Sequence, residues 1–181
     1  MFSKHVTVDE AVYLLDVDSA EKLEEAESLG LIRRLKPNNK KESFLIQDVV
    51  TLKLALCIMD LGLAPDRAIR YAEAVLGVQS TQTFNKAISW LDGETHELFC
   101  MFADKQLSRI FIRSVEDGRE LEVGAEKPVL FPISRCELNV SRAVRPVITR
   151  ISHLMASKKK HSRQSTVSNE KSEQQSPATV K

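Results

Sequence analysis

At 181 residues the chain is long enough for one ordinary domain, or for a small module followed by a second small domain. Apolar residues make up 43% and charged residues 28%, which is close to a soluble globular average and excludes a fully disordered or a membrane-embedded class. The formal net charge is only +1, so any case for nucleic-acid binding must rest on local patches.

Three further features of the sequence concern the compartment. No apolar run approaches the roughly 18 to 20 residues of a membrane span, and residues 1–7 lack the basic region and apolar core of a signal peptide. Cys57, Cys100 and Cys136 lie far apart, without the close pairing of a disulfide framework or a zinc ribbon. We therefore expect a cytoplasmic protein without a membrane partner.

The first elements that the sequence predicts are two short helices. Thr7 followed by Glu10 is the pattern of a capping box, and apolar residues follow at helical spacing up to Leu15. Ser19 can cap a second helix, and Gly30 can close it. Its predicted buried stripe consists of Leu23, Ala26 and Leu29. Two short helices joined by a tight turn are typical of a helix-turn-helix unit.

A basic segment comes next. Leu31–Lys36 favours an extended conformation, residues 37–41 favour a turn, and Ser43–Leu45 is extended again, which together predicts a small β-hairpin. Five cations fall within nine residues, namely Arg33, Arg34, Lys36, Lys40 and Lys41. Such a run suits phosphate contacts driven by counterion release, although a solvated hairpin could carry the same charges. We call residues 33–41 the basic segment.

Two helices complete the N-terminal part. Gln47–Leu61 is almost entirely apolar over the length of a helix and stops at Gly62, so we expect it to be mostly buried. Pro65 favours a helix start, and Asp66–Leu76 then carries an apolar face. That face consists of Ala68, Ile69, Ala72, Val75 and Leu76.

Over about 70 residues the ordered set of these elements resembles the DNA-binding head of the MerR family of bacterial regulators. The matching residues are Thr7, Glu10 and Ala11; Glu27, Leu29, Gly30, Leu31 and Ile32; Arg33 and Arg34; Phe44, Asp48, Val49 and Leu52; and Leu61, Gly62, Leu63 and Ile69. The resemblance implies a winged helix-turn-helix whose second helix enters the major groove of double-stranded DNA while the wing touches phosphates. It also implies that the protein acts as a homodimer. The DNA-contacting residues would be Thr7, Ser19, Lys22, Arg33, Arg34, Lys36, Lys40 and Lys41.

The second helix departs from the family pattern. Where family members usually carry an arginine and aromatic residues, this chain has Glu24, Glu25 and Ala26, with Glu21 one turn earlier and Lys22 as the one cation of the helix. Carboxylates on this helix would meet phosphate oxygens. Two interpretations stay open: a transcriptional regulator that binds DNA mainly through the wing, or a winged-helix adaptor whose acidic helix docks a protein partner and that binds no DNA.

Residues 77–156 are predicted to form a small α+β region for dimerisation or sensing. Helices are expected at Thr83–Leu91 and Thr95–Ala103, strands at Ser108–Val115, Arg119–Val123 and Val129–Ile133, and a hairpin turn at Glu116–Gly118. An apolar stripe over Glu137–Met155 predicts a further helix, with Pro146 as the site of a kink or a break. The fold class is thus α+β, mostly α, with domains at 1–76, 77–156 and 157–181.

The last segment, residues 157–181, holds six Lys and Arg against two Asp and Glu and almost no large apolar residue, which predicts a basic disordered tail. Lys158, Lys159, Lys160 and Arg163 are candidate contacts to nucleic acid, and an acidic protein surface would attract the same residues.

Residues with catalytic or ligand-binding potential are few. His96 and Cys100 would share a helix face as a pair of metal or redox ligands, but two ligands without a third favour a surface histidine beside a core cysteine. Phe84, Trp90, Phe99 and Phe102 either line a ligand pocket or fill the core. The chain carries no phosphate loop, nucleophile elbow or paired catalytic carboxylates. We therefore expect no enzyme activity, no metal and no cofactor.

Overall fold

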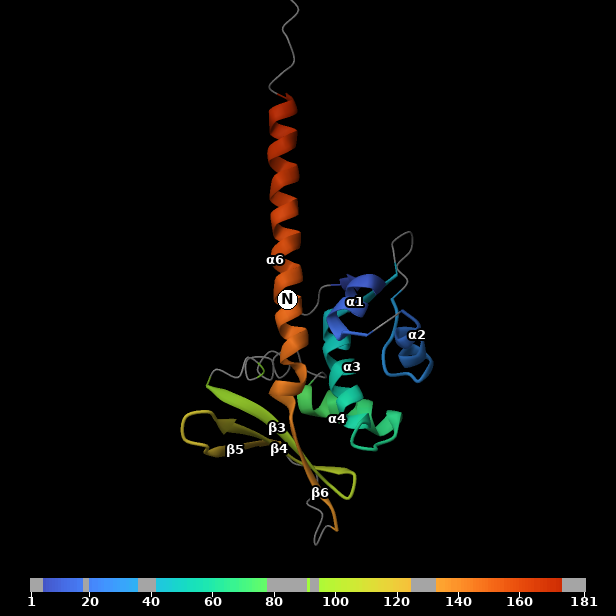
Figure 1. The fold of residues 1–181 in the computed structure, drawn as a ribbon, viewed down its shortest axis with the longest axis vertical. Helices are drawn as coiled ribbons and strands as arrows, with labels where there is room; N and C mark the ends of the chain where they lie inside the picture. Colours follow the sequence, from blue (N-terminus) through green and yellow to red (C-terminus); the bar gives the residue numbers. More distant parts are fainter. Residues whose placement is uncertain are drawn as a thin grey trace, which may run out of the picture. The chain divides into compact units, whose positions relative to one another are not determined.

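The structure is a computed structural model that describes residues 5–17, 20–35, 42–77, 91, 95–124 and 133–173, with side chains through residue 159. The described residues form five helices and two antiparallel sheets, of two and four strands (Figure 1). This mixed α+β composition, about half helical, confirms the coarse fold class. The chain divides into two compact units, residues 1–148 and 149–181, and the division falls within the last helix. The predicted domain limits near residues 76 and 156 stay predictions.

The first helix starts where the sequence predicts it. Strand β1 (His5–Thr7) leads into α1 (Val8–Leu15). The Thr7 hydroxyl accepts a hydrogen bond from the Glu10 backbone N–H at 3.3 Å, and the Glu10 carboxylate accepts from the Thr7 N–H at 3.0 Å. This reciprocal pair satisfies two N–H groups that the first turn leaves unpaired, so the predicted capping box is confirmed.

Helix α2 (Ala20–Ser28) ends at Gly30, as predicted. The Leu31 N–H donates to the Ala26 carbonyl at 2.9 Å and the Gly30 N–H to the Glu27 carbonyl at 3.0 Å, which is the hydrogen-bond pattern of a Schellman cap. Gly30 has φ +71°, a conformation that costs a residue with a Cβ atom about 1–2 kcal/mol. Leu29 lies in this turn and is 46% exposed, so its predicted place in the buried stripe is wrong.

The predicted hairpin contributes less sheet than expected. Leu35 and Ser43 form one antiparallel bridge, and residues 36–41 lie outside the described part. Strand β2 (Ser43–Leu45) pairs mainly with β1, with Val6 opposite Phe44, and both of these side chains are buried. The sequence pattern predicts no strand at His5–Thr7. Its three residues are too few for an alternating pattern, and only the pairing with β2 orders them.

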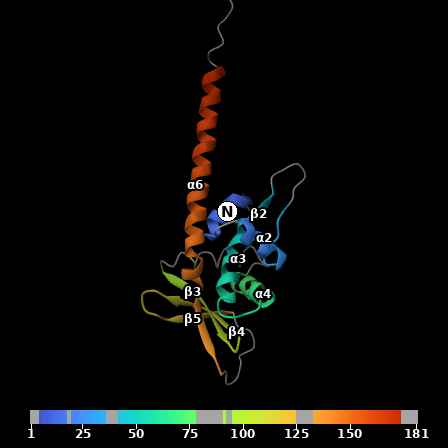
Figure 2. The same cartoon turned by 45° about the vertical axis from the view of Figure 1, so that its right-hand side comes forward.

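Helices α3 (Ile46–Met59) and α4 (Pro65–Leu76) lie side by side in both Figure 1 and Figure 2. Helix α3 buries residues around its whole circumference, as its apolar sequence predicts. Helix α4 has Pro65 in its first turn and buries Ala68, Ala72, Val75 and Leu76. Together the two helices form the centre of the N-terminal core.

The four-stranded sheet has the order β5-β4-β3-β6, and all pairs are antiparallel. Its strands are β3 (His96–Ala103), β4 (Gln106–Ser114), β5 (Glu120–Gly124) and β6 (Arg135–Asn139). The helix predicted at Thr95–Ala103 is therefore wrong. This short apolar run is compatible with a helix or with a strand buried on both faces. It forms a strand because it pairs with β4 on one side and with β6 on the other.

The predicted β4–β5 hairpin is confirmed, with its turn at Glu116–Gly118. Of the strand predicted at Val129–Ile133, only Ile133 is described, and it is exposed and lies outside any strand. Residues 83–90 of the predicted helix also fall outside the described part, whereas Leu91 is helical and buried.

Helix α6 (Val140–Glu173) begins three residues later than its predicted stripe, because Glu137–Asn139 belongs to β6. The side-chain oxygen of Asn139 accepts from the Arg142 N–H at 2.9 Å and so caps the helix. Pro146 lies inside the helix without breaking it. The helix continues to Glu173, so the segment for which a disordered tail was expected starts within a helix; residues 174–181 lie outside the described part. None of the described helices is apolar over a length that would cross a bilayer.

Candidate nucleic-acid interface

Helix α2 presents a charged outer surface. Leu23 and Ala26 are buried, whereas the opposite side of the helix is exposed. The exposed residues of α2 are Ala20, Glu21, Lys22, Glu24, Glu25 and Ser28. The outward position of Glu21, Lys22, Glu25 and Ser28 matches the prediction from the helical period. Three carboxylates and one ammonium group of α2 are therefore exposed.

Arg34 is held by carboxylates. Its guanidinium forms ion pairs with Glu42 at 2.6 Å, with Glu27 at 3.0 Å and with Glu24 at 3.9 Å, and its side chain is only 13% exposed. It also lies over the Phe44 ring, 5.8 Å from the centroid. The hydrogen bond to Glu42 raises the pKa of Arg34 above its ordinary value. Arg34 thus ties α2 to the strand after the basic segment, and a phosphate would have to compete with three carboxylates for it.

The other predicted DNA contacts are placed as follows. Arg33 and Lys22 are exposed. Thr7 is engaged in the α1 cap, where its hydroxyl already accepts a backbone hydrogen bond. Ser19, Lys36, Lys40 and Lys41 lie outside the described residues. Among the described members of the predicted set, Arg33 and Lys22 are therefore the exposed cations.

The predicted contacts of the last segment fall on α6. Lys158 and Lys159 are exposed side chains of that helix, whereas the side chains of Lys160 and Arg163 lie outside the described part. A helix holds such cations at a fixed spacing, whereas the tail composition predicts a flexible tether.

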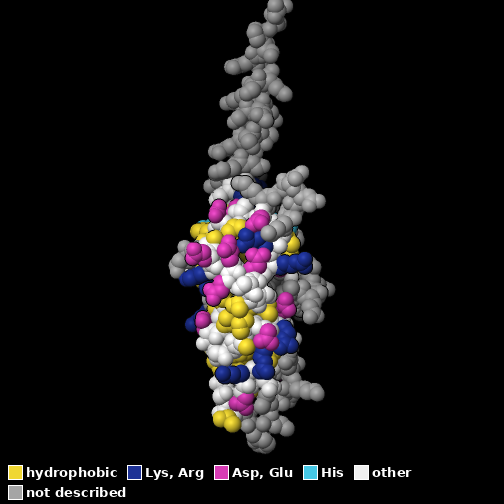
Figure 3. All heavy atoms as spheres, turned by 90° about the vertical axis from the view of Figure 1, so that its right-hand side faces the viewer, with side chains coloured by type: hydrophobic (Ala, Val, Ile, Leu, Met, Phe, Trp, Pro, Cys, Tyr) yellow, Lys and Arg dark blue, Asp and Glu magenta, His cyan; other side chains and the backbone are white. Residues whose placement is uncertain are grey.

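Charges of both signs are interspersed on the face shown in Figure 3. In α2 and the residues that follow it, the exposed carboxylates of Glu21, Glu24 and Glu25 are interspersed with the exposed cations Lys22 and Arg33. Strong non-specific attraction to a duplex needs a patch of one sign. Any DNA contact by this region must consequently be led by the basic segment.

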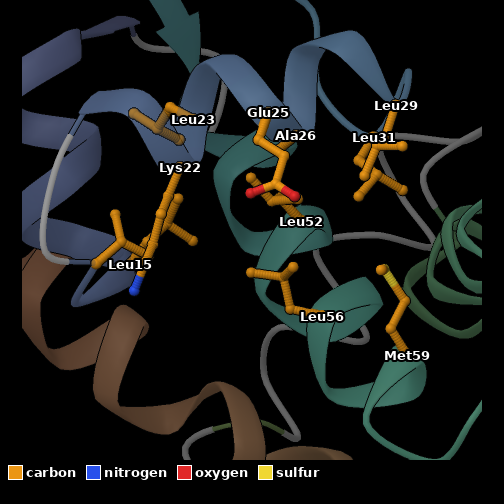
Figure 4. Close-up of a pocket in the computed structure, with 11 residues that line it drawn as sticks. Leu15, Lys22, Leu23, Glu25, Ala26, Leu29, Leu31, Leu52, Leu56 and Met59 are labelled. Atoms are coloured by element: carbon orange, nitrogen blue, oxygen red, sulfur yellow. The ribbon is translucent and has the colours of Figure 1, made fainter.

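A small apolar cavity lies beneath α2 (Figure 4). It has a volume of about 160 Å³ and is bounded by α1, α2 and α3. Leu15, Leu23, Leu52, Leu56 and Met59 supply most of its apolar wall. Figure 4 shows the Glu25 carboxylate directed toward Leu52, while the partly exposed Leu29 lies beside Leu31. The cavity is about as large as one that accepts a benzene-sized group.

A charged cluster that sequence reasoning missed lies at the start of α6. Glu97 on β3 accepts a hydrogen bond from Asn139 at 2.9 Å and forms ion pairs with Arg145 at 3.3 Å and Arg142 at 3.5 Å. Burial raises the pKa of Glu97, but the Asn139 hydrogen bond and the two guanidiniums outweigh burial and lower the pKa overall. No local signal could reveal the cluster, because Glu97 lies more than forty residues before Asn139, Arg142 and Arg145 in the sequence.

The remaining candidate residues lie in the sheet. Since β3 is a strand, His96 and Cys100 are separated by about 13 Å along it at 3.3 Å per residue, too far to share a metal ion. Cys100 is buried, which raises the pKa of its thiol. Phe99 stacks on Phe111 at 5.3 Å, and Phe102 contacts Tyr71 at 5.8 Å, so both act as core residues. Phe84 and Trp90 lie outside the described part.

No protein-family model matches this chain, and no curated protein shows a significant match to it.

Proposed function

We propose that the protein is a DNA-binding transcriptional regulator of the winged helix-turn-helix type, in which the basic segment leads the phosphate contacts. One observation supports this function above the others. Helix α2 buries only Leu23 and Ala26 and keeps its long outer side exposed, and its Schellman cap turns the chain directly into the basic segment. Winged helix-turn-helix proteins meet a duplex with an exposed second helix and a basic wing.

Helix α2 and the basic segment carry charges of opposite sign, so they contribute differently to DNA binding. Arg33 and the lysines of the basic segment neutralise phosphates, which gives sequence-independent affinity. Glu21, Glu24 and Glu25 repel phosphates, so the helix contributes little affinity, although a glutamate can accept a hydrogen bond from a cytosine amino group. The protein therefore binds a duplex with modest affinity and with a salt dependence set by the basic segment.

A salt titration tests this function. Fluorescence anisotropy of a labelled mixed-sequence duplex is measured between about 25 and 200 mM salt. The logarithm of affinity should fall linearly with the logarithm of salt concentration, and Arg33→Glu should lower both the affinity and the slope, the slope by about one unit. Arg119→Glu, the same change at an exposed arginine of the β4–β5 turn, serves as control and should leave both unchanged. Absence of duplex binding at the lowest salt would refute the proposal.

A second candidate function, a protein adaptor, is favoured by the cavity beneath α2. The cavity has room for one apolar side chain, and its lining includes the charged side chains of Lys22 and Glu25. A fitting occupant is the apolar anchor of a basic amphipathic helix from a partner protein, since its cations would pair with Glu21 and Glu25. Docking of a helix through apolar anchors is a common mode of recognition.

One substitution separates the two functions by the sign of its effect. Glu25→Lys should strengthen duplex binding if α2 faces DNA, and it should weaken binding of a synthetic Leu/Lys helical peptide if α2 docks a basic partner. Glu116→Lys, on the exposed β4–β5 turn, is the matched control for the change in net charge. Stronger duplex binding together with unchanged peptide binding favours the regulator, and the reverse pattern favours the adaptor.

A further inference from the structure

A second, larger cavity lies in the sheet part of the chain. Its volume is about 710 Å³, within the range of roughly 300–1,000 Å³ that is usual for small-molecule sites. Four elements bound it: the first half of β3, the end of β4 with its turn, the last residue of β6 and the first turns of α6. The lining includes Glu97, Phe99, Arg113, Asn139, Arg142 and Arg145.

Positive charge exceeds negative charge on the α6 side of this cavity. Arg142 and Arg145 share the single carboxylate of Glu97, which also accepts a hydrogen bond from Asn139. Arg142 is 75% exposed and its Nε lies 3.5 Å from Glu97, so most of its donors face solvent. Within the described part of the chain, the Nε–H of Arg145 has no acceptor. Among the described residues, Arg142 thus has exposed donors for an additional acceptor, and Arg145 has a buried N–H without one.

On the opposite wall the guanidinium of Arg113 is already paired with carboxylates. Arg113 stacks over the Phe99 ring, 4.3 Å from the centroid, and forms ion pairs with Glu120 at 2.7 Å and Glu137 at 3.1 Å. These contacts fix the guanidinium and compensate its charge. The unmatched charge of the cavity therefore belongs to Arg142 and Arg145.

We propose that this cavity binds a small organic anion, a carboxylate or a phosphate monoester, through Arg142 and Arg145. Guanidinium groups offer paired donors that match the two oxygens of a carboxylate or phosphate. Glu97 and Asn139 position the arginines and do not contact the anion: Glu97 anchors both guanidiniums, and Asn139 binds Glu97 while it caps α6. This site goes beyond the proposed function, since anion binding requires no DNA and would persist in an adaptor.

Direct binding to the full-length chain tests the site. Citrate and phenyl phosphate are titrated at constant ionic strength against sodium chloride, by calorimetry and by thermal shift. At least one probe should bind saturably and raise the melting temperature by several degrees more than chloride does. The probe that binds more tightly identifies the class, carboxylate or phosphate.

Variants locate the binding. Arg142→Ala should weaken it at least tenfold without loss of folding, because the side chain is largely exposed, and Arg142→Lys should restore part of it. Arg70→Ala, which removes an exposed arginine from α4, should leave it unchanged. Two results would overturn the proposal: neither probe stabilises the protein more than chloride, or Arg142→Ala binds as tightly as the unmodified chain. Equal weakening by Arg70→Ala would also overturn it, since it indicates diffuse attraction to surface charge.

Discussion

The N-terminal head, residues 5–77, and the sheet region, residues 95–148, are stabilised by different kinds of contact. In the head, the signals that start and end helices act over three to five residues, as in the Thr7–Glu10 capping box and the Gly30 turn. In the sheet region, the buried hydrogen bond from the Leu98 N–H to the Ser141 hydroxyl, at 2.7 Å, joins residues 43 positions apart. Local signals thus define the helices of the head, whereas β3 of the sheet region depends on partners that are distant in the sequence.

The two regions also handle charge in opposite ways. In the head, one guanidinium, that of Arg34, is surrounded by three carboxylates. In the sheet region, one carboxylate, that of Glu97, is approached by two guanidiniums. The head therefore offers a partner the exposed carboxylates of α2, and the sheet region offers the guanidiniums of Arg142 and Arg145. Four predictions, ordered by expected effect, test this comparison.

The largest effect is expected in the core of the sheet region. Phe111 is fully buried and stacks on Phe99. Phe111→Ala should lower the free energy of unfolding by about 3–5 kcal/mol, because it removes buried apolar surface and leaves a cavity. Urea denaturation measures the change, and Phe111→Leu should cost clearly less. A loss below 1 kcal/mol for the alanine variant would mean that the aromatic pair does not hold the sheet together.

The long-range hydrogen bond gives the next effect. Ser141→Ala should cost about 1–3 kcal/mol of unfolding free energy, since it leaves the buried Leu98 N–H without that acceptor. Ser28→Ala, which removes an exposed hydroxyl from α2, is the matched control and should change stability little. If a denaturant titration showed equal losses of unfolding free energy for the two variants, the hydrogen bond between Leu98 and Ser141 would not stabilise the sheet region as proposed.

A local signal of the head should matter less. Thr7→Ala removes the side-chain cap of α1 and should cost about 1 kcal/mol, whereas Thr7→Ser keeps the hydroxyl and should restore most of it. Thermal and urea unfolding measure both variants. If the cap cost more than the Ser141 hydroxyl, the distinction between a locally and a distantly stabilised region would fail.

The smallest effects depend on pH and have opposite signs in the two regions. Burial raises the pKa of Asp48, and the charge of Glu73 adds to this, so the ionised form destabilises the head. Asp48→Asn should raise stability above the folded-state pKa of Asp48, and the gain should vanish as pH falls below the unfolded value. The lowered pKa of Glu97 means that its ionised form stabilises the sheet region, and this contribution is lost as pH falls through the folded pKa.

The corresponding measurement is stability against pH for both variants. Glu97→Gln should be destabilising at neutral pH and approach the unmodified chain in acid. Asp48→Asn should be stabilising at neutral pH, and its stability should also approach that of the unmodified chain as pH falls. If each variant differed in stability from the unmodified chain by the same amount at every pH, the pKa values of Asp48 and Glu97 would not be shifted as their surroundings indicate.

The candidate sites also contain features that local sequence patterns predict and features that depend on distant residues. Sequence patterns placed the exposed charges of α2, because the helical period directs Glu21 and Glu25 away from Leu23 and Ala26. They could not show that Arg34 is enclosed by carboxylates, because Glu42 meets it only after the chain has turned through the basic segment. The arginines at the start of α6 escaped notice for the same reason, since Glu97 precedes them by more than forty residues.

By itself the sequence determined the helices of the head and the β4–β5 hairpin, because caps, turns and apolar periodicity act between residues that are neighbours in the chain. Only the tertiary structure decided the state of His96–Ala103, the pairing of β1 with β2 and the start of α6 at Val140. The physical reason is that a strand is stabilised by hydrogen bonds to partners that can lie anywhere in the sequence, so a short apolar run acquires its conformation only when those partners are in place.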